Sequence, residues 1–158
     1  MVELKKLNLG CGNTWLDGYI NIDKFPITFD IVNHDLEKGL PYFLNDNSVD
    51  YVIAHHVLEH ITNLDLLLND IHRVCVNGAT IDIIVPLANT LWDVADPSHV
   101  RRFNHKTFEY YCEGFSTSYK TTSLFIMVGQ NAISEVSQYF DGIEWKVANL
   151  HTILKVSK

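Results

Sequence analysis

The sequence predicts an α/β fold in which a mostly parallel sheet with short crossovers ends in a hairpin. Short apolar segments typical of strands recur along the first half of the chain, and one segment among them has a helical apolar stripe. Near the C-terminus, the run "YFDGIEW" (139–145) places Asp-Gly between strand-like residues, which is a strong signal for a hairpin turn.

The expected strands follow one another with short connections. They span residues 4–9, 19–22, 30–32, 48–54 and 80–86, and the sixth and seventh lie within 124–140 and 143–156, antiparallel to each other. The fourth ends in an almost continuous apolar run, as in a strand that is buried on both faces. Pro86 is expected to stop the fifth strand.

The clearest helix is expected between the fourth and fifth strands. Its apolar stripe consists of Leu64, Leu67, Leu68, Ile71 and Val74. Thr62 or Asn63 can cap its N-terminus, and Asn77-Gly78 is expected to end it. A second, short helix is expected over residues 104–114.

The length, charge and cysteine content of the chain exclude several classes of protein. A chain of 158 residues is expected to form one domain over residues 1–158, and its net charge of −7 disfavours binding to nucleic acid. The sequence shows no signal peptide and no apolar run long enough to cross a membrane. Three cysteines at wide spacings predict neither a disulfide framework nor a cysteine-rich zinc site. A cytoplasmic location is therefore expected.

The segment "LNLGCGNTWLDGYINID" (7–23) joins two strands through a glycine turn. Gly10-Cys11-Gly12 allows backbone amides to approach a ligand closely. Trp15 stands where a dinucleotide fingerprint requires a third small residue, and residues 13–18 are too few for a full helix. A pyrophosphate site depends on a helix N-terminus, so a cofactor without phosphates fits this turn better.

Acidic residues follow the next two strands. Asp23 can accept hydrogen bonds from a ribose diol, and Asp35 can accept from an exocyclic amine such as that of adenine. Together with the glycine turn, they describe a site for an adenosine that carries no phosphate. The alternative interpretation is a tight turn with solvated loop acids.

Five segments extend this interpretation to a family. In order they are "LNLGCG", "INID", "HDLEKGLPY", "NSVDYVIAHHVLEHI" and "DPSHVRRFN". Over roughly residues 5–112 the chain resembles the small class I S-adenosylmethionine-dependent methyltransferases. The resemblance implies a Rossmann-like three-layer fold, a seven-stranded sheet with an antiparallel last strand, and S-adenosylmethionine as cofactor. Compared with the family, the first crossover helix is reduced, so either an open site or a site closed by a second subunit in a homodimer is expected.

The resemblance also implies a cofactor site. It comprises Gly10, Cys11, Gly12, Asn13, Asp23, Lys24, Asp35, Leu36 and His55. The glycine turn would contact the methionine part, Asp23 the ribose, and Asp35 with Leu36 the adenine edge, while His55 would line the methionine and adenine side. An acid is frequent in the family where this chain has Asn8.

Catalytic candidates lie in "VADPSHVRRFN" (94–104), after the fifth strand. His99 has an imidazole suited to act as a base at neutral pH, Asp96 could orient it, and Arg101 could bind an anionic group of the substrate. His56 is the competing base. The alternative is that this segment only braces a loop. The substrate side would span about 86–131, and a small molecule or a sugar or glycan-type group is the expected acceptor.

Two rival functions stay open. The chain could bind the cofactor without catalysing transfer, since its first helix is reduced. In addition, residues 56–60, "HVLEH", match the H-x-x-E-H pattern of zinc hydrolases. A catalytic zinc requires a third protein ligand, and the sequence marks none out. The sequence therefore predicts no metal site.

Overall fold

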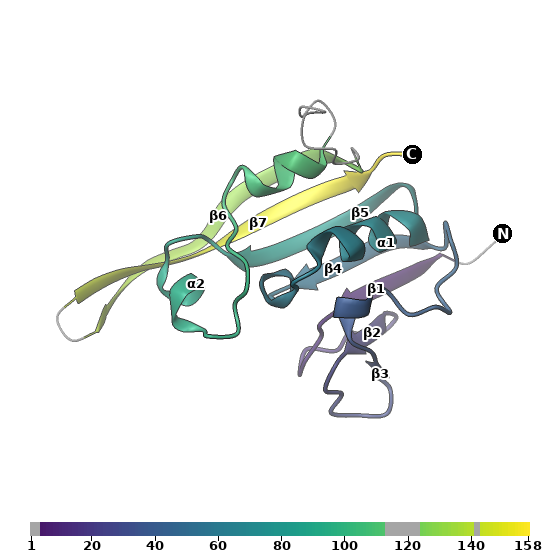
Figure 1. The fold of residues 1–158 in the computed structure, drawn as a ribbon, viewed down its shortest axis with the longest axis horizontal. Coiled ribbons are helices and arrows are strands. Elements are labelled where there is room, and N and C mark those ends of the chain that lie inside the picture. Colours follow the sequence, from purple (N-terminus) through teal and green to yellow (C-terminus); the bar gives the residue numbers. More distant parts are fainter. Residues whose placement is uncertain (1–3, 113–123, 141–142) are drawn as a thin grey trace.

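The computed structural model describes residues 4–112, 124–140 and 143–158. Seven strands form one sheet in the order β3-β2-β1-β4-β5-β7-β6 (Figure 1). The strands are β1 (Lys5–Leu9), β2 (Ile20–Asp23), β3 (Val32–Asn33), β4 (Val49–His55), β5 (Cys75–Pro86), β6 (Phe125–Phe140) and β7 (Ile143–Val156). Among the described strands, β7 alone points opposite to the rest of the sheet and pairs antiparallel with β5 and β6, so the predicted mostly parallel, seven-stranded sheet is confirmed.

The helices among the described residues are few and short. They are α1 (Leu64–Val74), α2 (Leu91–Ala95) and the 3-10 helices η1 (Leu36–Lys38), η2 (Leu58–His60) and η3 (Thr107–Tyr111). The predicted helix after the fourth strand is confirmed as α1, and the side-chain oxygen of Asn63 caps it by accepting from the amide of Leu66 at 3.2 Å. Of the helix predicted over residues 104–114, the part up to residue 112 contains only η3, and residues 113–114 lie outside the described residues. Helix α2 was not predicted.

The predicted end of α1 is wrong. The helix ends at Val74 rather than at Asn77-Gly78, because Cys75 already has extended backbone (φ −76, ψ 147) and begins β5. Strand β5 is therefore longer than expected at its N-terminal end.

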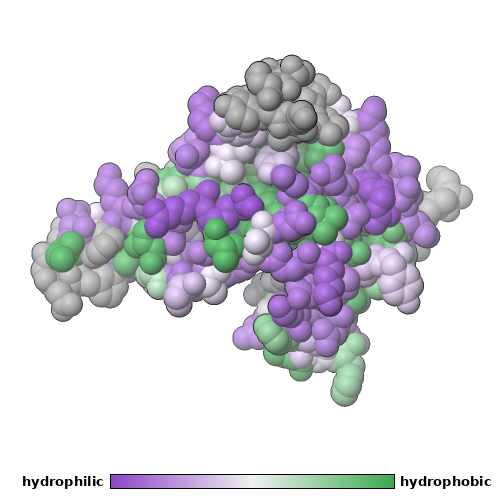
Figure 2. All heavy atoms as spheres, viewed as in Figure 1, coloured by the Kyte–Doolittle hydropathy of each residue, from purple (hydrophilic) through white to green (hydrophobic). Residues whose placement is uncertain are grey.

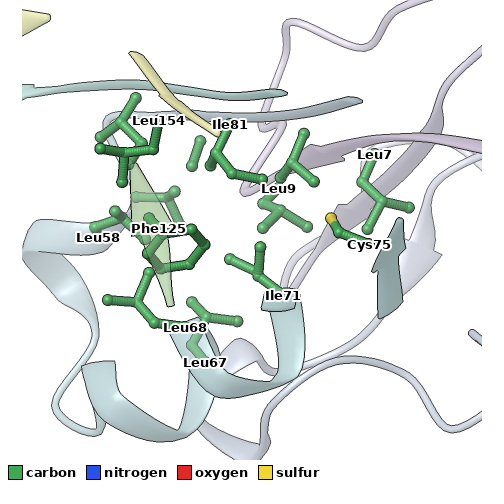
Figure 3. Packing of buried hydrophobic residues seen from close by; sticks show 14 of the residues in the cluster. Leu7, Leu9, Leu58, Leu67, Leu68, Ile71, Cys75, Ile81, Phe125 and Leu154 are labelled. Atoms are coloured by element: carbon green, nitrogen blue, oxygen red, sulfur yellow. The ribbon is translucent and has the colours of Figure 1, made fainter. Parts of the chain in front are cut away.

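The hydrophobic core lies between α1 and one face of the sheet (Figure 3). Leu67, Leu68 and Ile71 of α1 are completely buried, as are Ile81 and Leu154 on the strands. Burying each such side chain contributes about 1.5–3 kcal/mol, so the apolar stripe of α1 fixes the helix on the sheet. The ends of the parallel strands are thereby held at one edge of the molecule.

The opposite face of the central strands is only partly buried. Its side chains include Tyr51, Ile53, His55, Asp82, Ile84, His151 and Ile153, all of intermediate exposure. We call these seven residues the open face. On the side that carries α1, hydrophilic residues cover most of the surface and apolar ones occur in separate groups (Figure 2). No helix in the described ranges is long and apolar enough to cross a membrane.

The first crossover contains no helix between Gly10 and Tyr19. Two buried amides organise it instead: Asn8 donates to Asn21 and to the carbonyl of Thr14, both at 2.9 Å. Asn21 in turn accepts from the amide of Leu16 at 2.8 Å and donates to its carbonyl at 2.9 Å. The reduction of the first crossover helix is confirmed, and Asn8 has a structural role in the loop that replaces it.

Candidate functional site

A cleft of about 510 Å³ lies at the C-terminal ends of the parallel strands. We call it the large cleft, and its volume lies in the range of about 300–1,000 Å³ that is typical of small-molecule sites. It is lined by Gly10, Asp23, Lys24, Phe25, His34, Asp35, Leu36, Glu37, His56, Val57, His60, Ile61 and Ser98. The strand order reverses between β1 and β4, where ligands of open α/β sheets bind.

The glycine turn after β1 brings backbone into this cleft. Gly10 has φ +59, and a Cβ there would lie 2.5 Å from Cγ2 of Val57, so the turn packs directly against the loop after β4. Gly12 has φ +49, and its amide donates to Oδ2 of Asp23 at 2.8 Å. The acid at the end of β2 thus fixes the turn at the end of β1.

The two predicted acids both reach the large cleft. Asp23 also accepts from the amide of Phe25 at 2.8 Å, and its two carboxylate oxygens keep further lone pairs for a ligand. Asp35 forms an ion pair with Lys24 at 3.0 Å and accepts from the amide of Glu37 at 3.2 Å. The hydrogen bond from Lys24 and that from the Glu37 amide lower the pKa of Asp35, so it is an anionic acceptor at neutral pH.

The structure brings together most of the expected cofactor residues. Gly10, Asp23, Lys24, Asp35 and Leu36 line the large cleft, whereas Cys11, Gly12 and Asn13 do not. Cys11 is buried, and burial is the main reason why the pKa of its thiol is raised.

His55 is not where it was expected. Side chains alternate along β4, so His55 lies on the open face, where Nε2 is 3.0 Å from Oδ1 of Asp82. The next residue, His56, has φ +54 and lines the cleft instead. The role of His55 in cofactor binding stays a prediction, and its neighbour His56 is the residue that lines the cleft.

Several residues that line the cleft were not predicted. Phe25 follows the predicted Lys24 and His34 precedes the predicted Asp35, and this adjacency could have indicated them. Val57, Ile61 and Ser98 lie within the segments "NSVDYVIAHHVLEHI" and "DPSHVRRFN", but only tertiary packing shows that they reach the cleft.

A second hollow of about 370 Å³, the small cavity, adjoins the large cleft. It is lined by His56, Glu59, His60, Pro86, Trp92, Asp96, His99 and Asn149. His56 and His60 line both hollows and mark the boundary between them. The three residues predicted to be catalytic, His56, Asp96 and His99, therefore lie together.

His99 is held by its surroundings in one orientation. Its side chain is 9% exposed, and Nδ1 lies 3.1 Å from the carbonyl oxygen of Asp93. Because a carbonyl only accepts, Nδ1 carries the hydrogen, and Nε2 of the neutral ring carries a lone pair. Nε2 lies 3.7 Å from Oδ2 of Asp96. Hydrogen bonds from the hydroxyl and the amide of Ser98 lower the pKa of Asp96.

His56 combines exposure with an uncommon backbone conformation. Its side chain is 51% exposed, its Nδ1 lies 3.5 Å from Oε1 of Glu59, and its φ of +54 is in the left-handed region. Non-glycine residues in that region cost of order 1–3 kcal/mol and cluster at functional sites.

Arg101 does not line either hollow. Its guanidinium donates to the carbonyl of Thr62 at 2.9 Å, and its Nε is buried. In this structure Arg101 braces the loop that precedes α1. Its role in binding substrate stays a prediction.

Known proteins resemble this chain in sequence and in fold. A family model described as "Methyltransferase domain" matches residues 19–83. A provisionally assigned methyltransferase from Bacillus halodurans C-125 superposes with TM-score 0.69 at 12% identity, covering 100% of this chain and 94% of that one. An S-adenosylmethionine-dependent methyltransferase from Archaeoglobus fulgidus gives TM-score 0.65 at 16% identity, covering 97% and 86%.

A third solved structure, a methyltransferase from Thermotoga maritima that also depends on S-adenosylmethionine, gives TM-score 0.65 at 13% identity and covers 100% and 84%. At these identities the likeness concerns the fold. No curated protein matches the sequence.

Proposed function

We propose that this chain is a class I S-adenosylmethionine-dependent methyltransferase, which binds S-adenosylmethionine in the large cleft and methylates an acceptor in the small cavity. One observation carries the proposal: His56 and His60 line both hollows, so a ligand in one lies beside a ligand in the other. Direct transfer between two bound molecules requires this adjacency.

The chemistry is a displacement at the methyl carbon. A lone pair of the acceptor forms a bond to the methyl group, the carbon–sulfur bond breaks, and the sulfur keeps its electron pair as S-adenosylhomocysteine forms. An acceptor that carries a proton must lose it. His56 at the boundary and His99, with its Nε2 lone pair, are the side chains in position to assist, and Asp96 lies within 3.7 Å of His99.

The residues that line the small cavity indicate the charge and type of acceptor that it can bind. Among the residues that the structure describes, the lining contains the carboxylates of Glu59 and Asp96 and neither lysine nor arginine, which disfavours an anionic acceptor. Trp92 offers a partly exposed aromatic surface, and a small polar molecule or a sugar hydroxyl suits such a wall. Closure of the large cleft by a second subunit stays a prediction.

Binding of S-adenosylhomocysteine to the purified chain, measured by isothermal titration calorimetry, tests the proposal. We expect one molecule per chain. Asp23→Ala should weaken binding about 10- to 100-fold, because it removes charge-assisted hydrogen bonds to the ribose. Asp17→Ala is the matched control, since Asp17 is an exposed acid of the same crossover and does not line the cleft.

Turnover is measured as S-adenosylhomocysteine formed from S-adenosylmethionine in the presence of small hydroxyl-bearing acceptors and sugars. Binding without turnover by any acceptor would favour the non-catalytic alternative. Absence of binding would refute both this alternative and the proposal.

A further inference from the structure

We propose that Glu59, His60 and His99 bind a divalent transition-metal ion in the wall of the small cavity. One potential donor atom from each of these three residues lies within 4.8 Å of the other two. Glu59 and His60 belong to η2, and His99 lies in the loop after α2. The two segments are tied together by the amide of Val100, which donates to the carbonyl of Glu59 at 2.9 Å.

Glu59 supplies the first argument. Its side chain is only 2% exposed, it lines the small cavity, and its Oε2 has no hydrogen-bond partner among the described residues. Its other oxygen has only a 3.5 Å contact with His56. A buried carboxylate without full pairing is costly, and a bound cation would supply the missing partner.

The histidines supply the second argument. As shown above, Nδ1 of His99 donates to the carbonyl of Asp93. Nδ1 of His60 lies 3.1 Å from Oγ of Ser98, and that hydroxyl donates to Asp96 at 2.6 Å. The hydroxyl has only one hydrogen, so it accepts from His60, and Nε2 of both rings is left with a lone pair. Metal-binding histidines are typically held in this way, with the other ring nitrogen bound to a carbonyl or a hydrogen-bond network.

The donor types point to the class of ion. Two imidazoles and one carboxylate suit zinc or ferrous iron, whereas magnesium and calcium prefer oxygen ligands throughout. Donor atoms around tetrahedral zinc are about 3.3 Å apart, so the donor atoms, which lie within 4.8 Å of one another, would approach by at most about 1.5 Å on binding. The cavity of about 370 Å³ leaves room for a further ligand on the ion.

This set of ligands differs from the H-x-x-E-H pattern of the zinc hydrolases. In that pattern two histidines of one helix bind the ion and the glutamate acts as base. Here Glu59 is itself a donor, His99 replaces His56, and the 51% exposed His56 remains beside the site. The residues of the H-x-x-E-H pattern are therefore not used here as that pattern uses them, and the metal-assisted role in methyl transfer rests on the proposed function.

The role of the ion rests on the proposed function. A hydroxyl of the acceptor that coordinates the metal has a lower pKa and loses its proton more readily. The resulting oxygen attacks the methyl carbon, and the carbon–sulfur bond breaks toward sulfur. Because Nε2 of His99 is a ligand when the ion is bound, His99 no longer serves as base, and the proton leaves to His56 or to water. The substrate class is thus an oxygen nucleophile, an alcohol or a phenol.

Titration of the chelator-treated full chain with zinc chloride tests the site. We expect one ion per chain, and at about one hundred times Kd the Tm should rise by about 5–10 °C. Glu59→Gln and His99→Ala should each weaken zinc binding by at least about 10- to 100-fold. His105→Ala is the matched control, since His105 is exposed and lies outside the cavity.

Circular dichroism establishes that each variant is folded, and either ligand variant alone suffices for the comparison. No zinc binding by the wild-type chain, or equal affinity in a folded ligand variant and the wild type, would overturn the inference. S-adenosylhomocysteine binding is measured on the same samples. Cofactor binding without zinc binding defeats only the metal site, and zinc binding without cofactor binding defeats only the proposed function.

Discussion

The two glycines of the turn after β1 are required for different reasons. Both have positive φ, but a Cβ at Gly10 would lie 2.5 Å from the Val57 side chain, whereas a Cβ at Gly12 would meet nothing within 4 Å. The first glycine is needed for conformation and space, and the second for conformation only. Gly10 thereby lets the loops after β1 and β4 meet in the floor of the large cleft.

Replacing each glycine by alanine should separate the energetic cost of the left-handed backbone from the cost of the close contact with Val57. Gly12→Ala should lower the free energy of unfolding by about 1–2 kcal/mol, the cost of the left-handed conformation. Gly10→Ala should cost a further 1–3 kcal/mol or so, because Val57 must move. Urea denaturation measures both. Equal losses of unfolding free energy in the two variants would mean that the loop after β4 moves away from the new Cβ at no energetic cost.

At the scale of elements, Glu37 connects η1 to the start of α1. Its carboxylate oxygens accept from the amides of Thr62 at 2.7 Å and Asn63 at 3.2 Å. Because these amides precede α1, the contact links the loop after β3 to the helix that carries the core. The hydrogen bond from the Thr62 amide is the main reason why the pKa of Glu37 lies below its ordinary value of 4.5.

Glu37→Gln should lower the free energy of unfolding by about 1–2 kcal/mol at pH 7. The pKa of Glu37 is lower in the folded than in the unfolded chain, so its contribution is present above the ordinary value of 4.5 and is lost as pH falls through the folded pKa. The difference between variant and wild type should therefore shrink in acid.

Urea denaturation across this pH range measures the effect. Glu109→Gln is the control, because it breaks the exposed pair between Glu109 and Lys106 and should change stability by less than about 1 kcal/mol. A difference between Glu37→Gln and wild type that stays constant with pH would contradict the pKa assignment.

At the scale of the whole molecule, the buried thiols report on unfolding. Cys75 is completely buried at the start of β5, and burial raises the pKa of its thiol to about 12. Only a thiolate reacts readily with disulfide reagents, so Cys75 should react only when the sheet opens.

We expect labelling of Cys75 at pH 8 to be more than about a thousandfold slower than in the urea-unfolded chain. A bound cofactor analogue should slow it further, because it stabilises the folded state. Mass spectrometry of the labelled chain identifies the residue. Rapid labelling of Cys75 in native buffer would show that β5 opens without global unfolding.

The sequence predicts this fold well where a pattern is long and regular. The apolar stripe of α1, the parallel strands and the final hairpin pairing were all expected, although Asp141 and Gly142 themselves lie outside the described residues. By contrast, α2, which was not predicted, has five residues and no side-chain cap. Strand β3 was expected over residues 30–32 but consists of Val32 and Asn33, because so short a strand carries no clear periodic signal.

In the site, the acids at strand ends were predictable, because the ends of parallel strands meet at one edge of a sheet. That His56 and not His55 lines the cleft depends on the left-handed backbone of His56, which cannot be read from its residue type. The contact of Arg101 with Thr62 is likewise visible only from tertiary packing. The association of His99 with Glu59 also depends on packing between segments far apart in the chain.

One carboxylate of the open face fixes how the two halves of the sheet are aligned. Oδ1 of Asp82 on β5 accepts from His55 on β4 at 3.0 Å and from His151 on β7 at 2.9 Å. A one-residue slip of β7 would replace His151 by an inward-facing neighbour and expose Leu150 at the same time. These two hydrogen bonds of Asp82 thus hold β7 in register with the parallel strands β4 and β5. They lie on the open face of the sheet, opposite α1.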